Sequence, residues 1–95
     1  MSATGEAFKA YDAAAIDAFA AYYQRRQGAD TAYCEATMNA FDESFDNADT
    51  AAKAFCNALE AARDSLDRAQ KAACEAFCRA LETAAAAYRR AVDGS

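Results

Sequence analysis

The sequence contains no histidine and no proline, and it has only three glycines. Without histidine the chain lacks the commonest general base, the usual partner of a nucleophilic cysteine and the imidazole ligand of metal sites. It also lacks a glycine-rich loop of the kind that binds phosphate groups. These absences argue against most catalytic chemistry, so we expect a protein that is not an enzyme.

Residues that interrupt helices are scarce, and so are large aliphatic residues. Glycine occurs only at Gly5, Gly28 and Gly94, and the chain has three leucines, one isoleucine and one valine. Alanine, the best helix former, supplies most of the apolar content. The sequence therefore predicts an all-α fold whose core consists of aromatic rings set among alanines.

Positive charge is in deficit, since the formal net charge is −5 at neutral pH. Binding to a phosphate backbone depends on Lys and Arg, so we expect no nucleic-acid partner. No apolar run approaches the roughly 20 residues of a transmembrane helix, and the N-terminus lacks the layout of a signal peptide. We expect a soluble acidic protein without a transmembrane segment, either cytoplasmic or secreted and processed.

An 11-residue repeat extends from Ala54 to Val92. Residues of one character recur at every eleventh position, in three rows: Phe55, Leu66, Phe77 and Tyr88; Ala58, Ala69, Ala80 and Ala91; and Ala62, Ala73 and Ala84. Eleven residues make about three helical turns, so these rows form one nearly straight apolar stripe. The same register continues upstream through Tyr11, Tyr22 and Tyr33. We predict one helical domain, residues 1–95, built on this repeat.

Local signals divide the chain further. Gly28 sits where a helix C-cap belongs, the segment 46–50 is the strongest turn signal, and Ser65 can cap a new helix. The sequence therefore predicts an antiparallel four-helix bundle with helices at about 5–27, 30–46, 49–64 and 66–92. The alternative is a three-helix chain in which 49–92 forms one long helix, and a dimer buries its overhanging apolar residues.

The four cysteines are the only candidate chemical site: Cys34, Cys56, Cys74 and Cys78. In the four-helix arrangement they lie in one slab of the bundle. Three interpretations follow: small core residues, disulfides that staple a weak core, or thiolate ligands of Zn²⁺, Cu(I) or an iron–sulfur cluster, with Met38 as a possible extra ligand. The C-x-x-C spacing of common metal sites is absent.

Three functions remain open on this basis. The first is an interaction or scaffolding module without a cofactor, whose partner is another protein or a second copy of the chain. The second is a bundle that binds metal through the thiolates of the four cysteines. The third is a disulfide-stapled secreted or surface-active protein.

Overall fold

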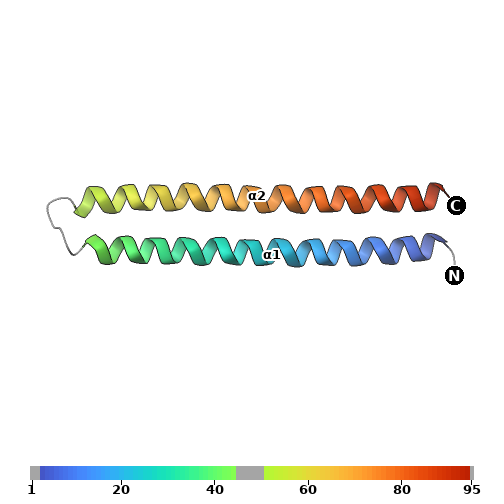
Figure 1. Ribbon diagram of the computed structural model, residues 1–95, viewed down its shortest axis with the longest axis horizontal. Coiled ribbons are helices and arrows are strands. Elements are labelled where there is room, and N and C mark those ends of the chain that lie inside the picture. Colours follow the sequence, from blue (N-terminus) through green and yellow to red (C-terminus); the bar gives the residue numbers. More distant parts are fainter. Residues whose placement is uncertain (1–2, 45–50, 95) are drawn as a thin grey trace. The chain divides into compact units, whose positions relative to one another are not determined.

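The computed structural model describes residues 3–44 and 51–94, and its secondary structure consists of two long helices (Figure 1). Helix α1 comprises Ala3–Ser44 and helix α2 comprises Ala51–Asp93. The prediction of an all-α protein is confirmed, whereas the number of helices is smaller than predicted. Within the described part of the chain, neither helix contains a stretch that is long and apolar enough to cross a membrane.

Helix α1 continues through Gly28, so the predicted boundary between helices 5–27 and 30–46 is wrong. Gly28 does not have the positive φ of a helix C-cap. The half-buried row Arg26, Ala29 and Tyr33 carries the inward side of the helix across this point. A glycine inside a helix costs about 1 kcal/mol relative to alanine, whereas ending and restarting the helix would leave several backbone groups without helical partners. A continuous helix is therefore lower in free energy than two helices separated at Gly28.

Replacing Gly28 by alanine is expected to stabilise the protein by about 0.5–1 kcal/mol, because alanine has less conformational freedom to lose on folding. A Cβ atom at this position would meet nothing within 4 Å. Thermal or urea unfolding followed by circular dichroism measures the change. A loss of stability on Gly28→Ala would instead indicate the C-cap that the sequence suggested, since alanine is strained there.

Helix α2 also continues through its predicted break, so helices 49–64 and 66–92 are one helix. The alternative of a single long helix in this region is confirmed for Ala51–Asp93. Ser65 is exposed in the middle of α2, and its Oγ accepts a hydrogen bond from Arg68 Nη2 at 3.5 Å. Its local capping tendency is outweighed by the good helix formers on both sides. The predicted turn at 46–50 lies outside the described residues.

The two helices form two units. The first unit pairs residues 3–24 with 73–94, and the second pairs 25–44 with 51–72. Within each unit the two segments lie side by side and run in opposite directions (Figure 1).

Ring contacts in the first unit show how its two segments are aligned. Tyr11 of α1 contacts Tyr88 of α2. Eleven residues later in α1, Tyr22 contacts Phe77, which lies eleven residues earlier in α2. The contacts therefore follow the 11-residue spacing in opposite directions along the two helices.

In residues 4–43 and 52–94, the most buried side chains are all alanines. In α2 they are Ala62, Ala73 and Ala84, spaced by eleven residues and exposed by 9%, 1% and 7%. Their counterparts in α1 are Ala7 and Ala40. Among the described residues no large side chain is fully buried. The aromatic rings thus lie at the flanks of the helix contact, where each keeps part of its surface exposed.

One predicted row of the apolar stripe faces outward. Ala69, Ala80 and Ala91 of this row are exposed and only Ala58 is half-buried, whereas the row formed by Leu59, Gln70, Leu81 and Val92 is half-buried throughout. Burying a leucine removes far more apolar surface from water than burying an alanine does. The inward side of α2 is therefore rotated towards its larger side chains.

Candidate interaction surface

The four predicted site cysteines are all free and exposed. Cys74 and Cys78 belong to the first unit, and Cys34 and Cys56 belong to the second. Their expected convergence in one slab depended on turns near residues 28–30 and 64–67, and both helices continue through these positions. The geometric basis for that slab is therefore absent.

Two of the cysteines take part in hydrogen bonds, Cys74 through its thiol and Cys34 through its backbone carbonyl. The Cys74 thiol donates to the Tyr22 hydroxyl oxygen across the first unit, with 3.8 Å between the sulfur and oxygen atoms. The Thr37 hydroxyl donates to the Cys34 carbonyl oxygen at 2.9 Å. In the part of the chain that the structure describes, no three Cys, Asp or Glu side chains are grouped so that they could hold a metal ion.

An aromatic cluster joins the two segments of the first unit. Phe77 contacts both Phe19 and Tyr22, with ring centroids 6.3 and 5.3 Å apart, respectively. Tyr11 and Tyr88 meet edge to face at 6.0 Å. Each such pair contributes roughly 0.5–1.5 kcal/mol beyond the burial of its area. These rings are the main large side chains that hold the unit together.

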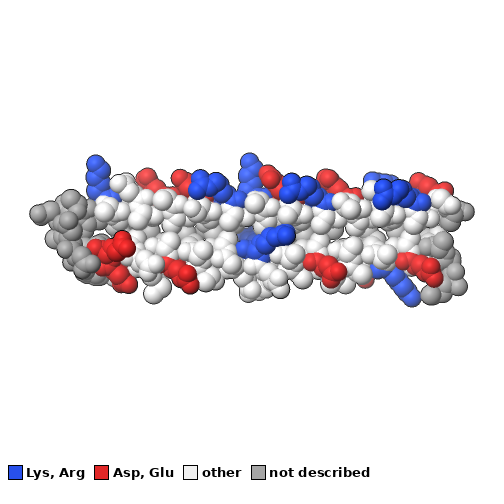
Figure 2. All heavy atoms as spheres, in the orientation of Figure 1, with Lys and Arg blue, Asp and Glu red and all other residues white. Residues whose placement is uncertain are grey.

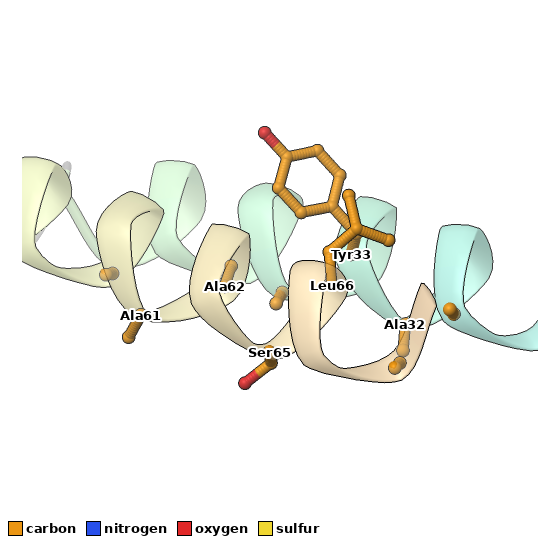
Figure 3. A pocket seen from close by; sticks show the side chains of 10 residues that line it. Ala32, Tyr33, Ala61, Ala62, Ser65 and Leu66 are labelled. Atoms are coloured by element: carbon orange, nitrogen blue, oxygen red, sulfur yellow. The ribbon is translucent and has the colours of Figure 1, made fainter. Parts of the chain in front are cut away.

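In the second unit, Phe41 contacts Phe55 at 6.1 Å, and a shallow groove of about 600 Å³ runs between the segments. Seven alanines line this groove together with Tyr33, Leu66 and Ser65. Figure 3 shows the Tyr33 ring beside Leu66, with the Ser65 hydroxyl directed away from both. Because binding sites for small molecules usually contain several convergent polar groups, this groove has little means of orienting a ligand.

Large exposed apolar side chains occur on α1. In the first unit they are Phe8, Ile16, Phe19 and Tyr23, with 58%, 60%, 58% and 56% of their surface exposed. At about 100° per residue these four positions fall within an arc of about 80° on the helix. We call them the α1 patch. The second unit exposes Met38 by 67% and Phe41 by 53%.

The sequence indicated an apolar side on this helix, but it did not separate the residues that face α2 from those that face outward. Tyr11, Ala15 and Tyr22 are half-buried, whereas Phe8 and Tyr23 are exposed. The sequence feature that could have revealed the outward-facing residues is the width of the apolar side of the helix. Neighbouring residues such as Tyr22 and Tyr23 point about 100° apart, so one partner helix cannot cover both.

The two helices also differ in charge. Helix α1 contains seven acidic and three basic residues, which gives a net charge of −4, whereas α2 contains six acidic and seven basic residues and has a net charge of +1. Figure 2 shows most Lys and Arg side chains over α2, interspersed with acidic ones, and mainly acidic side chains along α1. A partner of α1 is therefore favoured when it is neutral or basic.

No protein-family model matches the sequence, no curated protein is significantly similar to it, and no solved structure matches it.

Proposed function

We propose that this chain is a non-enzymatic interaction module, and that the α1 patch is the surface through which it binds another protein. The observation that carries the proposal is the exposure of four large apolar side chains on one side of α1. Large apolar side chains that are grouped and exposed in this way mark protein interfaces, because leaving them in water is unfavourable. The exposed carboxylate of Asp12 lies among them. Aromatic anchors such as Phe8, Phe19 and Tyr23 are typical of the residues that dominate binding energy.

Hydroxyl-radical labelling followed by mass spectrometry tests this proposal by comparing two adjacent tyrosines, Tyr22 and Tyr23. Tyr22 is half-buried against α2, and Tyr23 is 56% exposed. In an isolated chain Tyr23 should therefore be labelled faster than Tyr22. If the patch is occupied, labelling of Tyr23 falls to the level of Tyr22 or below, either in the purified protein or in an extract of cells that express it. Fast labelling of Tyr23 in both samples would overturn the proposal.

A variant with Ala at all four cysteine positions separates this function from thiolate metal binding. The thiols are exposed, so each replacement is expected to change the free energy of unfolding by no more than about 0.5 kcal/mol. The protection of Tyr23 should persist in this variant. If protection of Tyr23 and bound metal were lost together, the metal-binding alternative would replace the interaction module.

A further inference from the structure

We infer that the occupant of the α1 patch is a second copy of this chain, so that two copies form a four-helix dimer. This inference rests on the proposed function, because it names the partner of the same surface. It is argued from the exposed area, the lack of a large buried side chain and the charges of the two helices.

The exposed apolar side chains of the α1 patch offer surface area that a dimer interface can bury. At about 200 Å² for each large side chain, the four residues of the α1 patch expose on the order of 460 Å² in the first unit. This is more than half of the approximately 800 Å² that one partner contributes to a standard interface.

The weak core of the chain favours its own copy over a partner that is present only at times. The buried side chains are all alanines, and no large side chain among the described residues is fully buried. A fold with so little internal burial depends on further burial for its stability. A second copy is available at the same concentration whenever the chain is made, and binding to it stabilises the folded state by mass action.

Charge selects how the two copies pair. Placing α1 against α1 of the second copy would bring together two helices of net charge −4, whereas α1 against α2 of the second copy pairs −4 with +1. Like charges across an interface disfavour association. We therefore assign the partner position beside α1 to α2 of the second copy, in a symmetric dimer in which each copy contributes the same surface.

Sedimentation equilibrium of the full chain tests the dimer. Wild-type protein is expected to have twice the chain mass of 10.1 kDa at micromolar concentrations. Ile16→Glu places a charge in the α1 patch, where it must be desolvated twice in each dimer, and should raise the dissociation constant at least 100-fold. Gln24→Glu adds the same charge at an exposed position about 80° away from Ile16 around the helix, and is expected to change it less than 10-fold.

A second measurement keeps the test decisive if Ile16→Glu does not fold. The midpoint of thermal unfolding of the wild-type dimer must rise with protein concentration. A wild-type chain that remains monomeric, with a midpoint independent of concentration, would overturn the dimer. In that case, protection of Tyr23 in the extract alone would retain the proposed interaction surface with a different protein. Exposure of Tyr23 in both samples would reject the surface as well.

Cross-linking of carboxylates to lysines in a mixture of labelled and unlabelled copies tests the pairing. Links between the copies are expected to join acidic residues of α1 to Lys53 or Lys71 of α2, which are exposed. Links between the copies that join acidic residues of α1 only to Lys9 would favour α1 against α1 and reject the assigned arrangement.

Discussion

Replacing Phe77 by alanine is expected to destabilise the protein by about 2–4 kcal/mol, the largest effect of any single truncation in the first unit. Its ring contacts both Phe19 and Tyr22. A fully buried phenylalanine costs about 3–5 kcal/mol when truncated to alanine, and Phe77 is half-buried, so a value towards the lower end is expected. Urea unfolding followed by circular dichroism gives the free energy directly.

Two variants control this measurement. Arg79→Ala removes a long exposed side chain two residues away on the same helix, and is expected to change stability by no more than about 0.5 kcal/mol. Phe77→Leu retains much of the apolar volume and should cost less than Phe77→Ala. If Phe77→Ala and Arg79→Ala were equally mild, the aromatic cluster would not hold the unit together.

Replacing Ala73 by leucine is expected to destabilise the protein by about 1–3 kcal/mol, although leucine is the more apolar residue. Ala73 is the most buried side chain among the described residues, with 1% of its surface exposed. Extra methylene groups at such a position must push the helices apart or adopt strained rotamers. The row formed by Ala62, Ala73 and Ala84 depends on small side chains for its close packing.

The neighbouring residue provides a matched control. Ala72 is exposed, so Ala72→Leu makes the same chemical change outside the helix contact. Its effect on the free energy of unfolding is expected to lie within about 0.5 kcal/mol of zero. Unfolding of both variants should be compared at one protein concentration. Equal stabilities for Ala73→Leu and Ala72→Leu would contradict the close packing of this row.

The all-α fold follows from composition, but the number of helices does not. The sequence contains genuine local stop signals, at Gly28 and at Ser65, and each of them favours a helix end by about 1 kcal/mol or less. Whether such a signal ends a helix depends on what the next turns can pack against. That packing involves residues far away in the sequence. The residues around Gly28 or Ser65 alone therefore do not reveal whether the helix ends there.

The candidate surface was predictable only in part for the same reason. The apolar character of Phe8, Phe19 and Tyr23 is evident in the sequence, and so is their helical spacing. Which of two adjacent apolar rows faces α2 depends on the alignment of the helices, which the contact of Tyr22 with Phe77 reveals. The predicted grouping of the cysteines in one slab depended on turns that do not form, whereas a role for their thiols stays a prediction.

The alignment of Tyr11 with Tyr88 and of Tyr22 with Phe77 has a consequence for how such a chain can change in length. Eleven residues make about three helical turns, so a residue and the one eleven positions later point in nearly the same direction. Removing eleven residues from each of the two helices would therefore leave the remaining side chains facing nearly the same neighbours. Removing nine residues, which make two and a half turns, would rotate every later side chain by about 180°. Gene segments encoding eleven residues are therefore natural units of duplication and loss for this architecture, in the way that whole repeats are for solenoid proteins.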